Sequence, residues 1–268
     1  MQRNSVLTVL LVLLVFPVMT FAHPQGEGEV GVRIVSDSGV QFPKHGAYPR
    51  GRHEGRFFYL EAVKGQRYSI EVTNRSGRRI GVVIAVDGRN IINGKKSDLK
   101  QDEQMYIIAP FETNTFEGWR TGMDRTNRFY FTEQSDSYAE KVFADASAMG
   151  TIALAVYREK IPDIDLYSGK QSRMKEEPAA PCAPDESRYS ATAERKKSEQ
   201  PGTGFGETTH SPAMVVHFDP ETTMAEKIVL KYEWRSELCR KGIISCGPKN
   251  RFWPEDYEFA PIPKDFRG

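Results

Sequence analysis

The stretch that decides the fold is RIGVVIAV, residues 79–86, which is followed directly by Asp87-Gly88. In an extended chain, alternate side chains lie on opposite faces. One face of this stretch would carry Ile80, Val82, Ile84 and Val86. The other face is small and apolar, so we predict a strand in the middle of a sheet. Asp-Gly after such a run is the strongest local signal of a two-residue type I′ turn.

The same region, VVIAVDGRNIING at residues 82–94, also has the oxygen-bearing side chains that a calcium loop would need. An EF-hand loop requires a ligand at its third position and a glycine at its sixth. Counted from Asp87, these positions are Arg89 and Ile92, which do not fit. We therefore predict a hairpin turn and no metal site, and expect Gly88→Val to lower stability because a β-branched residue resists positive φ.

Further alternating stretches surround this strand, among them RYSIEVT at residues 67–73 and GTIALAVYRE at residues 150–159. Gly, Pro, Asn and Asp clusters separate them at short intervals, and only residues 135–146 have a helical pattern. A parallel doubly wound sheet would need helices between its strands. The pattern predicts an all-β fold over residues 29–160, an antiparallel β-sandwich of jelly-roll or immunoglobulin-like type.

The composition changes after this region. Residues 161–200 are charged and rich in Pro, which predicts a disordered linker or long loop. In the C-terminal part, 201–268, the alternating stretches 213–220 and 226–235 predict a β-hairpin, and a lone hairpin is too weak to stand apart from the sandwich. We expect it to pack back on the sandwich, with the GTGFG motif at 202–206 as a flexible entry and a Pro- and aromatic-rich tail along the surface.

The N-terminus has the layout of a secretory signal peptide. Arg3 precedes an apolar run over residues 6–16, and small or polar residues lead to Ala22. A retained membrane anchor is the alternative, but the run is shorter than the roughly 18–20 residues that cross a bilayer. We predict that residues 1–22 are removed, that no membrane-spanning segment remains, and that the protein is periplasmic or extracellular.

Charge and cysteine content exclude several functions. The chain has 37 basic and 36 acidic residues, so its net charge of +1 argues against nucleic-acid binding. Cysteines of exported proteins usually pair. A Cys239–Cys246 bridge would contribute roughly 2.5 kcal/mol and leave Cys182 single; three free thiols are the alternative. No zinc-ligand spacing or cofactor motif is present, so we predict neither a metal nor a cofactor.

The best binding candidates surround EGWRTGMDRTNRFYF, residues 117–131, where an aromatic and cationic surface could take a sugar ring or an anionic polymer. The candidate contacts are Tyr106, Trp119, Arg120, Arg125 and Arg128. In the alternative interpretation, Trp119 packs at the edge of the sandwich and the arginines solvate a loop.

Two weaker signals remain. His53 or His210 could serve a hydrolase, but no nucleophile elbow or metalloprotease helix accompanies either. The sequon Asn74-Arg75-Ser76 fits a turn between strands better than a glycosylation site.

Several phrases of the sequence, including residues 59–95, 106–141, 202–220 and 231–244, resemble a family of uncharacterised exported bacterial proteins. The resemblance implies secretion, a β-rich core and a C-terminal hairpin in the same fold unit. It implies no catalytic residue, substrate or cofactor. The sequence therefore predicts a non-enzymatic module of the bacterial envelope, whose partner is an envelope protein or a polysaccharide. A carbohydrate-binding module is the first alternative, and a hydrolase the second.

Overall fold

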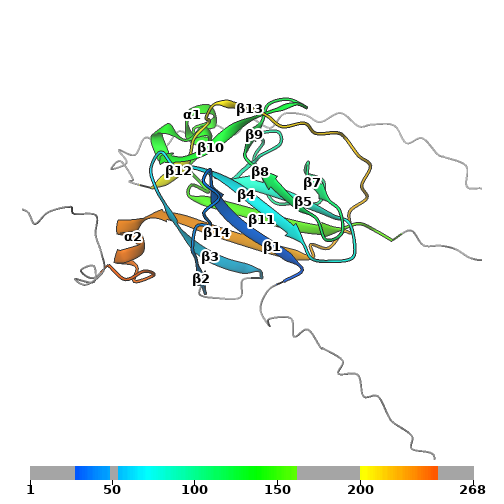
Figure 1. Cartoon of the computed structure of the whole chain (residues 1–268), viewed down its shortest axis with the longest axis horizontal. Helices are drawn as coiled ribbons and strands as arrows, with labels where there is room; N and C mark the ends of the chain where they lie inside the picture. The colour runs from blue at the N-terminus through cyan, green and yellow to red at the C-terminus, as the bar shows by residue number, and fades with distance from the viewer. Residues whose placement is uncertain (1–27, 49–53, 162–199, 247–268) are drawn as a thin grey trace, which may run out of the picture.

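The computed structural model describes residues 28–48, 54–161 and 200–246. These residues build two β-sheets that pack face to face around one core (Figure 1). The predicted signal peptide, all but the two end residues of the predicted linker 161–200, and the tail from residue 247 lie outside the described ranges.

The first sheet has seven strands in the order β1-β4-β10-β12, with β8 beside β4 and with β9 and β13 beside β10. Its strands are β1 (Val30–Ser36), β4 (Arg67–Asn74), β8 (Thr113–Phe116), β9 (Gly118–Arg120), β10 (Arg125–Glu133), β12 (Pro201–Thr203) and β13 (Thr208–His210). Every pair in this sheet is antiparallel.

The second sheet also has seven strands, in the order β2-β3-β14-β11-β5-β6 with β7 beside β5. Its strands are β2 (Lys44–Ala47), β3 (Arg56–Ala62), β5 (Ile80–Val86), β6 (Arg89–Asn90), β7 (Tyr106–Ile108), β11 (Thr151–Arg158) and β14 (Glu226–Trp234). Here β14 runs parallel to β3 and antiparallel to β11. The predicted all-β sandwich is confirmed, with this one parallel pair as a departure from purely antiparallel sheets.

Helices are short. A 3-10 turn (Gln134–Asp136) and α1 (Tyr138–Phe143) form the predicted helical stretch, and α2 (Arg235–Arg240) follows β14. In the described ranges, no helix has the length and apolar character needed to cross a membrane.

The core confirms the predicted alternation. Tyr68, Ile70 and Val72 of β4 are fully buried against the inner face of the second sheet. Burying each large side chain of this kind favours folding by roughly 1.5–3 kcal/mol. All seven residues of β5 are buried, because a smaller apolar cluster that includes Leu99 and Met105 covers its outer face. The strand is thus buried on both faces, as its sequence predicts.

The turn after β5 has the predicted type I′ geometry. Asp87 and Gly88 have φ values of 48° and 77°, and Val86 pairs with Arg89 directly across the turn. Positive φ at both central residues defines this turn class.

The predicted C-terminal hairpin is wrong. Residues 226–234 do form a strand, but residues 213–220 form no strand, and Val215 is 89% exposed. Instead of pairing with a neighbour in sequence, β14 inserts between β3 and β11. Residues 28–161 therefore do not complete the sandwich alone, since its second sheet needs a strand from the C-terminal part.

The GTGFG motif is also different from the prediction. Pro201, Gly202 and Thr203 form the buried strand β12, paired with β10. A Cβ atom at Gly202 would lie 2.5 Å from the Ser137 Cβ, and one at Gly204 would lie 2.1 Å from the Tyr130 ring. The glycines allow a close approach of the chain to β10 and α1 and are not a flexible entry.

The Cys239–Cys246 disulfide is present, with a Cα–Cα distance of 5.6 Å. It ties the end of α2 to the chain that follows. Cys182 lies outside the described residues.

Candidate functional site

A groove of about 660 Å³ lies at one edge of the sandwich, and we call it the edge groove. Tyr106 and Ile107 of β7 line it from the second sheet, and residues 114–116 of β8 line it from the first. Within the described chain, β7 pairs only with β5 and β8 only with β4. Both strands are therefore sheet edges, which carry backbone groups available for another chain.

Residues 211–220, which we call the strap, form the third side of the edge groove. In Figure 1 the strap is the yellow-to-orange segment that runs from β13 past β8 and β7 before the chain enters β14. At its start, the N–H of Ser211 donates to the Asp124 carbonyl (2.8 Å) and the N–H of Ala213 donates to the Met123 carbonyl (2.7 Å). Among the described residues, no backbone–backbone hydrogen bond holds residues 214–218.

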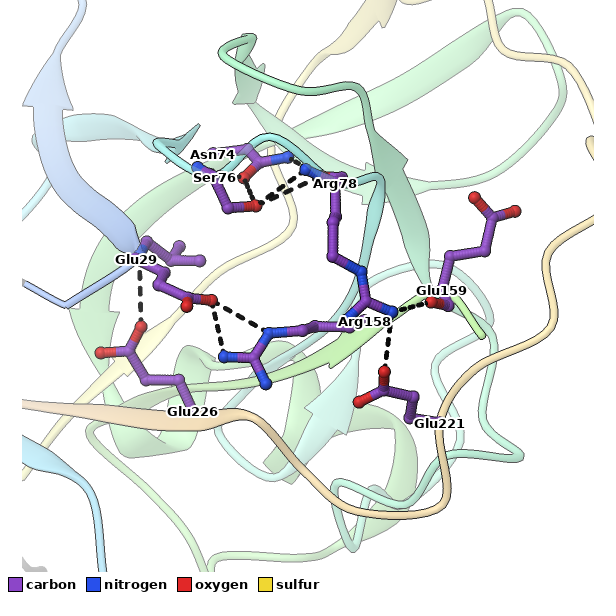
Figure 2. A network of polar contacts seen from close by, with 9 residues as sticks. Glu29, Asn74, Ser76, Arg78, Arg158, Glu159, Glu221 and Glu226 are labelled. Carbon is purple, nitrogen blue, oxygen red and sulfur yellow. Dashed lines mark hydrogen bonds and ion pairs between the residues drawn. The ribbon is translucent and has the colours of Figure 1, made fainter. Parts of the chain in front are cut away.

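The far end of the strap is fixed to the ends of β5 and β11. The N–H of Glu221 donates to the Arg158 carbonyl (2.8 Å). Figure 2 shows Arg78 between two partners, the Glu221 carboxylate at 2.7 Å and the backbone carbonyl of Glu159. Backbone hydrogen bonds thus hold the strap at both ends, while its middle makes none within the described residues.

Gly81 of β5 allows two side chains of the groove, Met105 and Phe218, to pack directly on the strand. A Cβ atom at Gly81 would lie 2.2 Å from the Met105 sulfur and 2.7 Å from the Phe218 ring. Both side chains line the groove and rest where a side chain at position 81 would otherwise be. The absence of this side chain lets the strap lie against the sheet.

Arg120 is the one Lys or Arg among the described residues that line the edge groove. Its Nε donates to the Tyr106 hydroxyl (2.8 Å). Its terminal nitrogens donate to the Gly122 carbonyl (3.1 Å) and to the carbonyl (2.9 Å) and hydroxyl (3.2 Å) of Ser211. All of these acceptors are neutral, so the guanidinium charge is balanced by no carboxylate in the described chain. A guanidinium has five N–H donors, so four hydrogen bonds leave one donor for a ligand.

Two more polar atoms of the groove are without partners. Thr126 Oγ1, on a residue that is 3% exposed, and Gln101 Oε1 are buried and form no hydrogen bond within the described residues. A buried polar atom without a partner costs roughly 1–3 kcal/mol. Both atoms belong to residues that line the groove, although each atom is itself covered by neighbouring protein atoms.

Two carboxylates of described residues line the groove; both accept hydrogen bonds, but only Glu117 has an ion-pair partner. Glu103 accepts from the backbone N–H groups of Asp98 and Lys100, both at 2.9 Å. Glu117 accepts from Arg128 at 3.0 Å. Among the described residues of the groove, Arg120 and Glu103 are thus the charged groups without an ion-pair partner, and Arg120 is the one that keeps a free donor.

The structure separates the predicted binding residues. Tyr106 and Arg120 line the edge groove together, and burial raises the pKa of the Tyr106 hydroxyl although Arg120 opposes this shift. Trp119 is only 2% exposed, and its indole N–H donates to the Gly204 carbonyl (3.0 Å). It packs in the core because successive side chains of β9 point to opposite faces, so Trp119 and Arg120 cannot share a surface.

Arg125 and Arg128 do not line the groove. Arg125 is exposed and pairs with Asp124, while Arg128 pairs with Glu117 and Asp37. The predicted continuous surface of one tryptophan and three arginines is therefore not formed. The alternative is met only in part, because Trp119 is in the core rather than at the edge and Arg125 alone of the three arginines is exposed.

The residues proposed for hydrolysis are not assembled into a site. His53 lies outside the described residues, and His210 is exposed at the end of β13. The hydroxyl of Ser211, the residue after His210, accepts from Arg120. No group of three or more His, Cys, Asp or Glu side chains suited to a metal ion occurs in the described ranges.

The sequon serves the turn between β4 and β5. Asn74 is fully buried, and its amide donates to the Arg78 and Ala109 carbonyls at 2.7 and 2.9 Å. Figure 2 shows Ser76 bound to the Asn74 side-chain oxygen (2.8 Å). The amide nitrogen that glycosylation would need is thus committed to the fold.

Sequence reasoning missed a buried polar network centred on Asp87. One carboxylate oxygen accepts from the Gly150 N–H (2.8 Å) and the Tyr232 hydroxyl (2.6 Å), and the other accepts from the Thr203 N–H (2.7 Å). The Thr203 hydroxyl lies 2.8 Å from the hydroxyls of both Tyr68 and Tyr232. Burial raises the pKa of Asp87 to about 6. The network joins the two sheets and is closed to solvent, so its role is structural.

Sequence reasoning also missed most of the groove lining, including Gln101, Met105, Met123 and the strap. One signal was available, since Pro212 and Pro220 flank the alternating residues 213–218 of the strap. Proline lacks the N–H that a sheet interior requires and argues against a central strand.

No family model, no curated protein and no solved structure matches this chain. The resemblance to exported bacterial proteins therefore stays a prediction.

Proposed function

We propose that this chain is an exported bacterial protein that acts as a non-enzymatic interaction module and binds its partner in the edge groove. The signal-peptide pattern supports export. The Cys239–Cys246 disulfide is compatible with an oxidising compartment.

One observation carries the proposal. The edge groove combines an arginine balanced by no carboxylate with two buried polar atoms that have no partner, between two sheet edges. Polar groups of this kind inside an apolar groove are what fix the orientation of a ligand. Its described lining has no histidine or cysteine, and its carboxylates are occupied, which favours binding over acid–base chemistry.

A carbohydrate ligand is the second candidate, because the uncompensated charge of Arg120 and the free oxygen of Gln101 would suit an acidic sugar. The aromatic side chains argue against it. Trp119 is in the core, and the Tyr106 ring packs on Phe116 with ring centroids 4.3 Å apart. Neither Trp119 nor Tyr106 therefore has a flat, exposed ring face on which a sugar could stack.

A site-specific photocrosslinker tests the proposal in a host bacterium that exports the protein. We would place it at Val215, which lines the groove and is 89% exposed, and as a matched control at Val40, which is 66% exposed and lies outside the groove lining. We expect a discrete adduct from position 215 and none from position 40. Identical adduct patterns from both positions, or none from either, would contradict the proposal.

A further inference from the structure

We infer that the edge groove takes an extended peptide segment with apolar side chains and a carboxylate, which binds Arg120. This inference rests on the proposed function and adds the chemical class of the ligand.

The backbone of the groove favours an extended chain. β7 and β8 each have one edge without a strand partner in the described chain, and residues 214–218 of the strap make no backbone–backbone hydrogen bond there. Extended peptides bind such edges by adding a strand, and their own N–H and C=O groups supply the hydrogen bonds. A peptide N–H is also the donor that the free oxygen of Gln101 lacks.

The side chains favour apolar residues in this peptide. The groove includes three methionines, at positions 105, 123 and 214, from three separate segments of the chain. Met123 is 53% exposed and Met214 80% exposed. Methionine side chains are flexible and polarizable, and they are common on surfaces that accept varied apolar partners.

The charge favours a carboxylate near Arg120. The four hydrogen bonds of Arg120 all go to neutral oxygens, and neither Glu103 nor Glu117 of the groove pairs with it. An arginine–carboxylate hydrogen bond is roughly twice as strong as a neutral one. An acidic group in the ligand would therefore determine its register in the groove.

The remaining polar atom fits the same ligand. The Thr126 hydroxyl, on β10 directly opposite Arg120, is buried and has no partner among the described residues. A hydroxyl can donate to a carboxylate or to a peptide carbonyl. This hydroxyl and the Gln101 oxygen are both covered by protein atoms, so a peptide with one acidic residue engages the free donor of Arg120 directly and these two atoms by rotation of their side chains.

Selection from a library of phage-displayed random dodecapeptides tests the inference. The exported full chain is immobilised, and an array of uronic-acid oligosaccharides is probed with the same preparation. We expect the selected peptides to share an acidic residue flanked by apolar ones, and we expect Arg120→Gln to weaken their binding at least tenfold.

Two variants at Met214 test the inference independently of any effect of Arg120→Gln on folding. Met214 is 80% exposed, so Met214→Glu and Met214→Lys leave the core intact. Met214→Glu should weaken binding of the selected acidic peptides several-fold, and Met214→Lys should strengthen it. Val40→Glu, on a residue that is 66% exposed and outside the groove lining, is the control and should change nothing.

The outcomes separate the two proposals. Oligosaccharides that bind in an Arg120-dependent manner, without any selected peptide, would overturn the peptide inference and leave the proposed function standing. Peptides that bind regardless of the Arg120 and Met214 changes would also overturn the inference. If neither library yields a groove-dependent ligand and the crosslinker at Val215 captures nothing, both proposals fail.

Discussion

Strand β14 and the strap have nearly the same sequence pattern and opposite structures. Both carry a large apolar side chain at every second position, over residues 226–234 and 213–218. In β14, Ile228, Leu230 and Tyr232 are at most 1% exposed, whereas on the corresponding face of the strap Met214 is 80% and Val216 44% exposed. Alternation alone therefore does not make a strand.

The difference lies in the partners that each segment finds. β14 enters a gap with β3 on one side and β11 on the other, so its backbone is paired along both edges. Pro212 and Pro220 flank the alternating residues of the strap. Its backbone is held by hydrogen bonds to Met123 near its start and to Arg158 from Glu221, the residue that follows it. A periodic pattern shows which face can be buried, but an available sheet edge decides whether burial occurs.

The largest expected effect comes from truncating one apolar side chain in each segment. Leu230→Ala removes a fully buried side chain and should lower the free energy of unfolding by about 3 kcal/mol. Val215→Ala, at an exposed position, should change it by less than about 0.5 kcal/mol. Urea unfolding followed by circular dichroism measures both. Equal losses would mean that the strap is part of the core.

A second effect concerns how β14 is fixed to the turn after β5. Asp87→Asn turns one acceptor into a donor that faces an N–H or hydroxyl donor, and we expect a loss of roughly 1–3 kcal/mol. Tyr232→Phe is the matched partial change, because it removes only one donor. Wild-type stability after Asp87→Asn would show that the network does not hold the sheets together.

The stability difference between the wild type and Asp87→Asn should depend on pH. Because burial raises the pKa of Asp87 from 3.8 to about 6, the folded state binds this proton more tightly than the unfolded state. The stabilisation that comes from binding this proton is fully present below about pH 3.8 and is lost as pH rises through about 6. Between pH 7 and 5 the wild type should therefore gain about 1 kcal/mol relative to Asp87→Asn. Parallel urea-midpoint curves over this range would contradict the shift.

A comparable effect is expected where the strap rests on the sheet. Gly81→Val would place its side chain where the Met105 sulfur and the Phe218 ring lie, and overpacking of this kind costs roughly 1–3 kcal/mol. Amide exchange should become faster at Ala213 and Glu221, whose N–H groups anchor the strap. Exchange that accelerates instead in β14 would indicate damage to the sheet itself.

The smallest effect is expected at the ion pair beside the strap. Arg78→Gln removes the bond to Glu221 between two partly exposed side chains, which typically contributes at most about 1 kcal/mol. We expect little change in global stability and faster amide exchange at Glu221 alone. Lys64→Gln, which removes a more exposed ion pair with Glu133, should leave exchange in the strap unchanged.

The sequence predicted the local features of the fold because these depend on neighbouring residues. The alternation of β4 and β5 and the Asp87-Gly88 turn follow from the geometry of an extended chain and from positive φ. The parallel pairing of β3 with β14 joins segments that are 172 positions apart, such as Arg56 and Ile228. Nothing in either strand alone specifies that partner.

Only the local part of the candidate site was predicted, because the rest depends on contacts between distant segments. Tyr106 and Arg120 were identified by residue type, and the fold places their side chains 2.8 Å apart. Trp119 was assigned to the same surface because it is adjacent in sequence, although adjacent residues of a strand face opposite sides. The groove itself depends on where the strap crosses the sheet edges, which the sequence pattern does not specify.

The central position of β14 also bears on the order of events during synthesis. Until residues 226–234 leave the ribosome, β3 and β11 each lack a neighbour, and the second sheet cannot close. Open edges of this kind favour intermolecular pairing. The chain therefore stays incompletely folded until residues 226–234 have been synthesised, however early the first sheet forms.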